Sequence, residues 1–380
     1  MKKLVIIGAS DFQNPLILKA KEMGYETHVF AWECGDIGEK TADYFYPVSI
    51  TEQDIILDMC RRIRPDGVTT IGSDLGMVTA TYVANGLGLT ANSVECEFQA
   101  SNKYAMRQCF KKHGVSVPDF FVTDGTENIG AIQAMKFPVI VKPTDRSGSR
   151  AITRVENIYG LKSAIEAACE VSFEKRAIVE GVIEGKEYSC ECISYRGEHK
   201  VLAMTEKMTT GEPHYIETGH IEPAVFSDHM VEPEILEAIF KALDALGIQY
   251  GASHTEFRVS EKGKIGIIEI GARMGGDCIG SHLVPLSAGY DFMKMVIDTA
   301  VGNKPDMVKI NKGGVSRIQF ILNHEDFRKY QQIRENHPEC IIEASEMDQA
   351  MTHAVVDSGS RYGFYIMKFS DREKMMEVLG

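Results

Sequence analysis

The chain has 380 residues, of which 44% are hydrophobic and 25% charged, and this composition is typical of a globular protein long enough for two or three domains. Its formal net charge of −13 argues against nucleic acid or an anionic membrane as the main partner, although it leaves room for a local basic pocket. The nine cysteines form no CxxC pair, no window has the length of a membrane span, and the start, MKKLVIIGAS, lacks the features of a signal peptide, so we expect a cytoplasmic protein with reduced thiols.

Strands and helices alternate over residues 1–94, which predicts an α/β domain with a doubly wound parallel sheet. The first strand-to-helix turn, GASDFQN, is not GxGxxG, and a looser match at 86–91 follows a helix instead of a strand. The sequence also lacks GxxxxGKS and GxxxxGKT, so it favours neither an NAD-linked oxidoreductase nor a P-loop protein. The predicted strands are 4–7, 26–31 and 67–71, and the predicted helices are 15–23, 54–63 and 77–85.

The rest of the chain predicts α+β structure. Ser101 is a plausible N-cap for a helix over 101–112. FPVIVKPTDRSGSRAITRV, residues 137–155, predicts a strand, a flexible loop and a second strand. A strand over 201–206 is followed by a long polar loop over 207–223. The other predicted elements are helices over 161–169, 232–246 and near 290–300, two strands within 176–194, and strands near 315–322 and 351–356.

HTEFRVSEKGKIGIIEIGAR, residues 254–273, predicts a β-hairpin with a two-residue Lys-Gly turn. Symmetric pairing about that turn places Glu256 directly opposite Glu269, and Phe257 opposite Ile268. Directly opposed residues have Cβ atoms only about 5 Å apart, so the two carboxylates repel each other unless a cation lies between them. The predicted core face carries Phe257, Val259, Ile268 and Ile270, and the other face carries His254, Glu256, Arg258 and Glu269.

Two interpretations of the paired glutamates stay open. A divalent metal with oxygen ligands would neutralise both carboxylates, and Mg²⁺ suits a site that also binds phosphate. Alternatively, the pair lies on a solvated face, and Arg258 supplies the counter-charge.

Two further stretches contain residues suited to a nucleotide. Lys142 ends an apolar strand and opens a loop that contains Ser147, Gly148 and Ser149, whose backbone N–H groups could hold phosphate beside the lysine charge. The alternative is a mobile hairpin tip with a solvated lysine. In AIVEGVIEGKEYS, the bend after Glu180 could pair with an adenine edge, and Glu187 could accept hydrogen bonds from a ribose, although acids on edge strands are common.

The order of these features is more specific than any of them alone. A helix lysine, Lys103, precedes the strand lysine with its Gly/Ser loop, then comes Glu-x-x-Ile before Gly-x-Glu, and then the paired glutamates with Arg273 four residues after the second. This order resembles the ATP-grasp superfamily of carboxylate–amine ligases, over residues 1 to about 305. The resemblance implies a pre-ATP-grasp α/β domain (1–94), an α+β ATP-grasp domain (95–303) in which residues 115–183 form a mobile lid, and a small C-terminal α+β unit (304–380).

The resemblance also implies which residues bind ATP and metal. Lys103 and Lys142 would hold the α- and β-phosphates, and Arg273 would face the transferred phosphate, so Lys142 and Arg273 are the expected catalytic residues. Ser147, Gly148 and Ser149 would close over the triphosphate, Glu180, Gly181 and Ile183 would frame the adenine, and Glu187 would bind the ribose. Glu256 and Glu269 would bridge Mg²⁺, or Mn²⁺, to the phosphates. Gly271 stands where the family usually has an asparagine for a second metal ion, so two-metal binding is the weaker expectation.

KMTTGEPHYIETGHIEPAVFS and GARMGGD resemble the L-amino-acid (dipeptide) ligase branch of the superfamily. Within that branch the resemblance implies that Glu217 meets a substrate amino group, and that His220, Arg273 and Gly276 also contact the substrates. The alternative for Glu217 and His220 is a polar loop whose groups satisfy one another. Arg361 could reach the same site, with a purely structural role as the alternative.

The function implied by the resemblance is that of an ATP- and Mg²⁺-dependent ligase. It would form an acyl-phosphate from a small carboxylic or amino acid, release ADP, and join the acyl group to an amine. The alternatives are a purine-pathway or carbamoyl-phosphate-synthase-like ATP-grasp enzyme, and a nucleotide-binding protein without turnover. We expect small-molecule substrates, no nucleic acid or membrane partner, and a homodimer as the commonest assembly.

Overall fold

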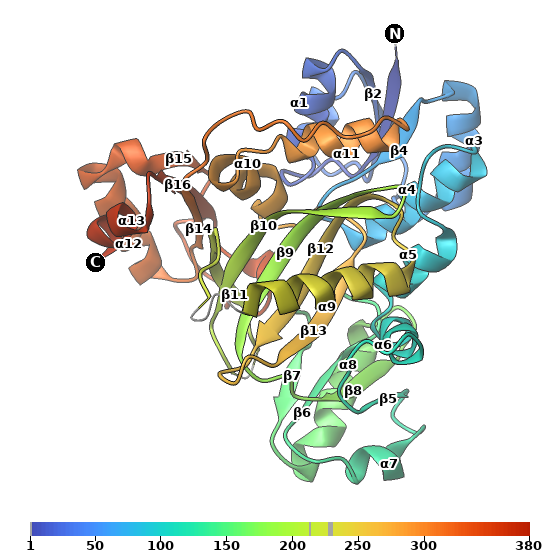
Figure 1. Ribbon diagram of the computed structural model, residues 1–380, viewed down its shortest axis with the longest axis vertical. Helices are drawn as coiled ribbons and strands as arrows, with labels where there is room; N and C mark the ends of the chain where they lie inside the picture. The colour runs from blue at the N-terminus through green and yellow to red at the C-terminus, as the bar shows by residue number, and fades with distance from the viewer. Residues whose placement is uncertain (1, 213, 227–230) are drawn as a thin grey trace.

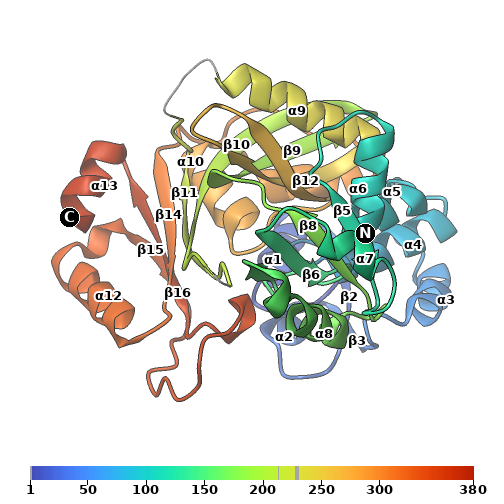
Figure 2. The same cartoon turned by 90° about the horizontal axis from the view of Figure 1, so that it is seen from below.

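The computed structural model describes residues 2–212, 214–226 and 231–380 (Figure 1). Within these residues the strands form one sheet of eight strands and two sheets of four. The eight-stranded sheet lies in the middle of the molecule, the N-terminal domain lies at one end, and a small sheet, β5-β8-β6-β7, lies at the other (Figure 1). The C-terminal segment forms a third lobe, which Figure 2 shows beside the other two.

The N-terminal domain is the parallel α/β domain that the sequence predicts. Its strands lie in the order β3-β2-β1-β4, all parallel, so their carboxyl ends meet at one edge of the sheet. The apolar run of β1 is fully buried because helices cover both faces of the sheet. The elements are β1 (Lys3–Ile7), α1 (Asn14–Glu22), β2 (Glu26–Ala31), α2 (Ile37–Thr41), β3 (Tyr44–Pro47), α3 (Gln53–Ile63), β4 (Gly67–Thr69) and α4 (Asp74–Gly86).

Two helices, α5 (Val94–Ser101) and α6 (Lys103–Lys112), connect this domain to the rest of the chain. The prediction that Ser101 caps the second helix is wrong, since Ser101 ends α5. Asn102 caps α6 instead, and its side-chain oxygen accepts hydrogen bonds from the backbone N–H groups of Tyr104 and Ala105. Asparagine is at least as good an N-cap as serine, and it fixes where α6 begins.

The small sheet contains the predicted strand, loop and strand of residues 137–155. Loop 144–152 joins two of its strands and ends beside the large sheet, as the lining of the pocket described below shows. Leu161, Ala164, Ile165 and Ala168 of its longer helix are buried against the sheet. The elements are β5 (Phe120–Thr123), α7 (Ile129–Gln133), β6 (Val139–Pro143), β7 (Thr153–Val155), η1 (Ile158–Gly160), α8 (Leu161–Val171) and β8 (Ala177–Gly181).

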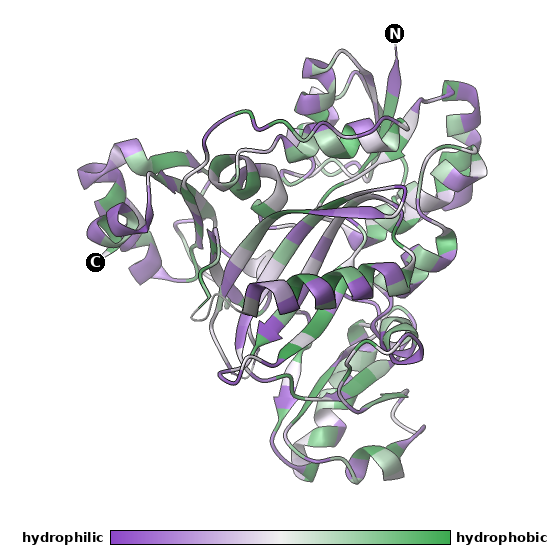
Figure 3. Ribbon diagram, in the orientation of Figure 1, coloured by the Kyte–Doolittle hydropathy of each residue, from purple (hydrophilic) through white to green (hydrophobic). Residues whose placement is uncertain are grey.

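The large sheet is antiparallel in the region of the predicted hairpin, and α9 (Val231–Leu246) packs on it. Figure 3 shows α9 with hydrophobic and hydrophilic residues in turn along its length, and its buried members, from Ile235 to Leu246, belong to one core with the sheet. The strands are β9 (Lys186–Tyr195), β10 (Glu198–Thr209), β11 (Glu217–Glu222), β12 (Tyr250–Val259) and β13 (Ile265–Gly271).

The prediction of a polar loop over 207–223 is wrong for most of its length. Strand β10 continues to Thr209, and residues 217–222 form β11, which pairs with β10 on one side and with β14 on the other. Polar residues enter these strands because one face of the sheet lines the functional pocket instead of a core, so hydropathy alone hides the strand pattern.

The hairpin pairs Glu256 with Glu269, as predicted, but its turn and part of its register differ. A bulge follows this pair, so Phe257 lies opposite Ile267, and Ile268 is the extra residue. Backbone hydrogen bonding between Ser260 and Lys264 closes a three-residue loop, in which Gly263 has φ of +74°. The predicted pairing of Phe257 with Ile268 is therefore wrong, and Ile267 enters the core while Ile268 lines the pocket.

The C-terminal segment extends the large sheet, in which β14 pairs with β11. The predicted strand near 351–356 is wrong, because the strands are at 341–344 and 364–369 and the segment between them forms a loop closed by a hydrogen bond from the ring of His353 to the carbonyl of Ser360. The remaining elements are η2 (Ile279–Leu283), α10 (Val284–Ser287), α11 (Phe292–Ala300), β14 (Val315–Phe320), α12 (His324–Asn336), η3 (Pro338–Cys340), β15 (Ile341–Ala344), η4 (Ser358–Ser360), β16 (Phe364–Phe369) and α13 (Arg372–Leu379).

Candidate active site

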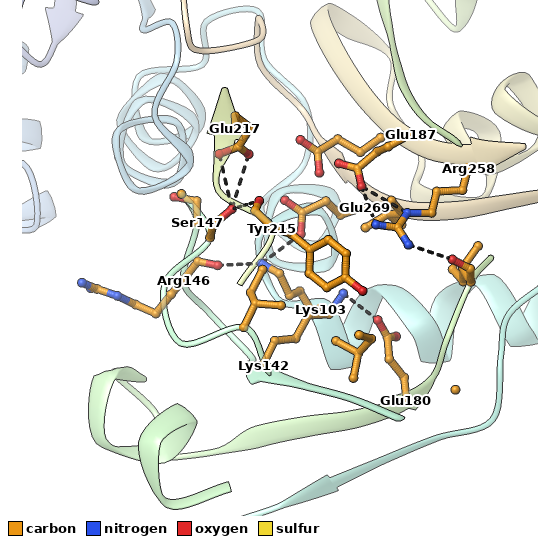
Figure 4. A pocket seen from close by; sticks show the side chains of 18 residues that line it. Lys103, Lys142, Arg146, Ser147, Glu180, Glu187, Tyr215, Glu217, Arg258 and Glu269 are labelled. Carbon is orange, nitrogen blue, oxygen red and sulfur yellow. Dashed lines mark hydrogen bonds and ion pairs between the residues drawn. The ribbon is translucent and has the colours of Figure 1, made fainter. Parts of the chain in front are cut away.

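A pocket of about 800 Å³, partly open to solvent, lies between the small sheet and the large sheet (Figure 4). Its wall contains all nine residues predicted to bind a nucleotide, both paired glutamates and Glu217. The nine come from α6, β6, loop 144–152, and the stretch from β8 into β9. The structure thus gathers residues from positions 103 to 269 around one space. The predicted nucleotide-binding residues in this wall are Lys103, Lys142, Ser147, Gly148, Ser149, Glu180, Gly181, Ile183 and Glu187.

Lys142 and Glu180 form a buried ion pair at the base of this pocket. The Lys142 ammonium lies 2.6 Å from one carboxylate oxygen of Glu180, and the Arg107 guanidinium lies 2.8 Å from the other. Burial alone would raise the pKa of Glu180, but the two cations outweigh it and hold that pKa at about 2. The Glu180 side chain therefore holds two cations, and only its backbone is left to frame an adenine.

Arg107 is a site residue that the sequence analysis missed. It is 1% exposed, and besides Glu180 it donates a hydrogen bond of 2.8 Å to the carbonyl of Ile268, the bulge residue of the hairpin. Lys103 and Arg107 are four residues apart on one helix, so they lie on the same face. That spacing was the available signal, since the resemblance pointed only to Lys103.

Lys103 lies at the other side of the pocket, against the hairpin. Its ammonium is 3.0 Å from a carboxylate oxygen of Glu269 and donates a 2.7 Å hydrogen bond to the carbonyl of Arg146 (Figure 4). Burial lowers the pKa of Lys103, but Glu269 and Asp74 raise it more, so the lysine stays charged. Lys103 thereby joins the hairpin to the loop that is expected to close over the phosphates.

Lys207, on β10, supplies the counter-charge that the sequence analysis assigned to Arg258. Its ammonium contacts Glu256 directly and lies 3.6 Å from Glu187 and 3.7 Å from Glu217. Arg258 instead pairs with Glu187, at 2.8 Å. The three carboxylates raise the pKa of Lys207 although burial opposes this, and the Glu256 pKa falls well below its ordinary value. Lys207 was missed because it was placed in a loop.

The paired glutamates can share a metal ion with a bound phosphate. Among the residues described by the structure, no group of three or more His, Cys, Asp and Glu side chains is arranged to hold a metal. Glu256 and Glu269 lie opposite each other on adjacent strands, and both line the nucleotide pocket. Two carboxylates with the other ligands from phosphate and water are what Mg²⁺ commonly uses, so this donor set fits.

A second pocket, of about 620 Å³, adjoins the first. All four predicted substrate residues line it, and these are Glu217, His220, Arg273 and Gly276. Four residues line both pockets, and these are Ser147, Gly148, Glu217 and Glu256. A ligand in the second pocket would therefore lie next to the end of the first that contains the Gly/Ser loop.

The side chains of Arg273 and His220 are held in place by acids. The Arg273 guanidinium lies 2.6 Å from a carboxylate oxygen of Asp74, at the start of α4 in the N-terminal domain. His220 is 1% exposed and lies 3.4 Å from Asp277, and burial lowers its pKa. Asp277 itself makes two contacts, at 2.9 and 2.5 Å, with Arg361. Arg361 thus reaches the wall of the second pocket through Asp277.

The C-terminal segment also touches the Gly/Ser loop. Ser358 donates a 2.5 Å hydrogen bond to Glu217, and the Ser149 hydroxyl lies 3.4 Å from the same carboxylate. The backbone N–H of Ser358 donates to the carbonyl of Gly148 at 3.4 Å. Glu217 is consequently contacted by β10, the loop and the C-terminal segment at once, and a polar loop that satisfies only itself does not describe it.

The chain matches known proteins in sequence and in structure. Residues 135–281 match the family model of the ATP-grasp domain. The chain contains an ATP-grasp domain. It is 25% identical over 355 residues to the alanine–anticapsin ligase of Bacillus subtilis (strain 168), an alignment that covers 83% of this chain and 74% of the relative. It is 24% identical over 336 residues to the carbamoyl phosphate synthase large chain, N-terminal section, of Aquifex aeolicus (strain VF5), covering 81% of this chain and 59% of the relative.

A solved structure adds to the case for the ATP-grasp fold. The crystal structure of the L-amino acid ligase from Bacillus licheniformis aligns with a TM-score of 0.83 at 20% identity, covering 100% of this chain and 96% of that one. These similarities place an ATP-grasp domain at residues 135–281, and they confirm the fold that the sequence predicted. The roles of the single site residues stay predictions. Among the described residues, no helix is long and apolar enough to cross a membrane.

Proposed function

We propose that this ATP-grasp protein is an ADP-forming ligase that activates a small carboxylic or amino acid as an acyl-phosphate and joins it to an amine. The observation that carries the proposal is the adjacency of the two pockets. The residues expected to hold ATP line one, those expected to hold the acid line the other, and Ser147, Gly148, Glu217 and Glu256 line both. An acid carboxylate in the second pocket would lie beside the end of a triphosphate in the first.

The chemistry requires positive charge more than a nucleophilic side chain. A carboxylate oxygen of the acid forms a bond to the γ-phosphorus of ATP while the bond from that phosphorus to its bridging oxygen breaks, which gives an acyl-phosphate and ADP. The amine nitrogen then attacks the acyl carbon, phosphate leaves, and the nitrogen loses a proton. Negative charge spreads over the transferred phosphoryl group, so cations placed around it lower the barrier.

This chain supplies those cations from three directions. Lys142 from β6 lines the pocket on the small-sheet side, Lys103 from α6 lies against the hairpin, and Arg273, fixed by Asp74, lies on the acid side. A Mg²⁺ held by the paired glutamates would neutralise phosphate charge when bound. The Gly/Ser loop would exclude water, because an acyl-phosphate hydrolyses readily.

The test is ADP formation from ATP and Mg²⁺ with a panel of amino acids and small carboxylates, singly and in pairs. Glu269→Gln keeps the size of the side chain but removes the charge at the expected metal site. Glu156→Gln, an exposed glutamate on the small-sheet subdomain, is the matched control. ADP that requires a particular acid, is lost in Glu269→Gln and is kept in Glu156→Gln would support the ligase. Binding of ATP without ADP from any pair would favour a nucleotide-binding protein without turnover.

A second candidate is an activity like that of carbamoyl phosphate synthase, which the similarity to the Aquifex aeolicus large chain favours. The two candidates differ in the acid that is phosphorylated. Bicarbonate-dependent ADP formation that needs no organic acid would favour the second candidate, and dependence on an organic or amino acid would favour the ligase.

The location and assembly of the protein are part of the proposal. All nine cysteines are free thiols, and Cys190 and Cys192 lie 3.7 Å apart without forming a disulfide, which supports a reducing, cytoplasmic compartment. A homodimer is the assembly we propose from its general frequency among soluble oligomers. Light scattering of the purified protein measures it directly, and a monomeric mass would contradict it.

A further inference from the structure

A third pocket, with about 1610 Å³ of free space that is partly open to solvent, lies between the N-terminal domain and the Gly/Ser loop. It adjoins both pockets described above. It shares Lys103, Arg146, Ser147 and Glu269 with the first pocket, which is the nucleotide pocket. It shares Phe12, Gly72 and Ser147 with the second pocket, which we call the acid pocket. Ser147 therefore lies where all three spaces meet, and a molecule in the third pocket can reach an acyl group formed at that junction.

The position of the third pocket in the fold is that of a ligand site. Phe12 follows β1, Trp32 follows β2, and Gly72 follows β4, so the pocket lies at the carboxyl ends of the parallel strands. Strand β1 lies between β2 and β4, because the chain adds β2 and β3 on one side of β1 and then crosses over to add β4 on the other. Open α/β sheets bind ligands at this kind of crevice.

Large apolar side chains line this pocket and stay open to solvent. Trp32 is 57% exposed, Phe98 53%, Phe173 60% and Phe12 36%, and all four line the pocket. These side chains come from the N-terminal domain, α5, and the segment after α8, which are far apart in sequence. Exposed apolar surface gathered from several elements in one concave place is typical of a site that an apolar ligand covers.

The acids of the third pocket have partners, whereas its Arg146 has no ionic partner among the described residues. Its acids are all engaged, with Asp74 on Arg273, Glu269 on Lys103, Asp145 on the backbone N–H groups of residues 173 and 174, and Glu174 on Asn102 and Thr144. In the part of the chain that the structure describes, Arg146 forms no ion pair with any carboxylate, and its buried Nε has no hydrogen-bond partner. Arg146 stacks 4.3 Å over the ring of Phe173, and Arg150 lies 3.7 Å from its nearest acid, Asp357.

We propose that the third pocket binds the amine substrate, and that this amine carries both a large apolar group and an anionic group. The apolar group would cover Trp32 and Phe12, and the anionic group would meet Arg146 and Arg150. This inference rests on the proposed ligase function and narrows the substrate class of its second step, since the third pocket meets both the nucleotide pocket and the acid pocket at Ser147.

Trp32 gives a direct probe of binding, because it is the one tryptophan of the chain. With Mg²⁺ and ADP present, tryptophan emission is followed while L-phenylalanine, L-leucine, L-methionine, glycine or phenethylamine is added. We expect the emission to move to shorter wavelength with at least one of the three apolar amino acids, and not with glycine. A response to phenethylamine equal to that of phenylalanine would overturn the anionic part of the proposal, and no response to any apolar amino acid would overturn the apolar part.

Kinetics separates this inference from the proposed function. Hydroxylamine is a small amine that traps an acyl-phosphate as a hydroxamate without needing the third pocket. Trp32→Ala should leave hydroxamate formation unchanged and lower kcat/KM for the apolar amine about 10- to 100-fold, with little change for glycine. Arg150→Gln should raise KM for that amine and not for its amide. Tyr159→Ala, which removes a 91% exposed ring outside all three pockets, is the control.

The outcomes distinguish two kinds of failure. Hydroxamate formation together with unchanged amine selectivity in Trp32→Ala would overturn the inference and leave the ligase standing. No hydroxamate with any acid would count against the ligase, and the fluorescence titration would still decide whether the third pocket binds an apolar, anionic amine.

Discussion

Glu222 is a buried carboxyl group whose ionisation should set how stability depends on pH. It is 0% exposed at the end of β11, where Thr205 and Ser287 each place a hydroxyl oxygen 2.7 Å from one of its oxygens. No lysine or arginine pairs with it among the described residues. Burial raises the pKa of Glu222 to about 8, so the folded protein holds this proton at neutral pH.

The expected magnitude follows from proton linkage. The unfolded chain loses the Glu222 proton near pH 4.5, and the folded protein loses it near pH 8. Between these values the folded state binds more protons, so the free energy of unfolding falls as pH rises. Each pH unit changes the free energy of unfolding by about 1.4 kcal/mol per proton. Glu222 therefore lowers the free energy of unfolding by roughly 2 kcal/mol between pH 6 and 8, and by roughly 5 kcal/mol over the whole range between its two pKa values.

Glu222→Gln removes this titration and keeps the local hydrogen bonds, because the amide N–H donates to one hydroxyl and the amide oxygen accepts from the other. Urea unfolding of both proteins at pH 6, 7 and 8 gives the difference in the free energy of unfolding. We expect that difference to grow in favour of Glu222→Gln by roughly 2 kcal/mol from pH 6 to 8. Glu33→Gln, at an exposed glutamate, should show no such trend. A constant difference, or one that grows as pH falls, would refute the reasoning and show that Glu222 is charged in the folded protein.

Three further changes test the ion pairs of the site. Lys207→Met should lower the free energy of unfolding by about 3–5 kcal/mol, because it removes the buried cation that three carboxylates share, and Lys207→Arg should lower it less; thermal unfolding measures both. Arg107→Met leaves Lys142 as the one cation on Glu180, so we expect the affinity for ATP to fall at least tenfold in calorimetric titrations, and unchanged affinity would contradict this. Arg361→Gln frees Asp277, so KM for the acid should rise about tenfold while KM for ATP stays the same. A loss confined to kcat would contradict the placement of Arg361 at the acid pocket.

The hairpin shows how far sequence reasoning reaches. Alternation and the Lys-Gly pair placed Glu256 opposite Glu269 by assuming a two-residue turn, and this pairing holds because the extra residue Ile268 offsets the change to a three-residue loop. They did not show the bulge at Ile268, since an extra residue leaves the apolar pattern of IGIIEI almost unchanged. The bulge is held by a residue far away in sequence, Arg107, whose guanidinium binds the Ile268 carbonyl. Local pattern cannot report a contact of that kind.

The same limit explains the missed cations. Lys103 and Lys142 were found through resemblance to a family, whereas Lys207 looked like a residue of a polar loop. Its role as a counter-charge depends on three glutamates, one each on β9, β11 and β12, and none of them lies within nine residues of Lys207 in the sequence. Burial of a lysine is recognisable only after the strands that surround it are paired.

The pairing of charges in the nucleotide pocket bears on why a metal is needed. Among the described residues, five carboxylates line the pocket, and six lysine or arginine side chains line it or pair with these carboxylates. They are Glu180, Glu187, Glu217, Glu256 and Glu269 with Lys103, Arg107, Lys142, Arg146, Lys207 and Arg258. Each carboxylate expected near phosphate has a lysine on it, Lys207 on Glu256 and Lys103 on Glu269. A triphosphate that draws these lysines away leaves bare carboxylates beside phosphate oxygens, and two like charges about 4 Å apart repel by about 4 kcal/mol at the effective dielectric of a protein surface. A divalent cation between the glutamates replaces the lost positive charge, so the affinities for nucleotide and metal should each rise when the other is bound, with the paired glutamates as the point of coupling.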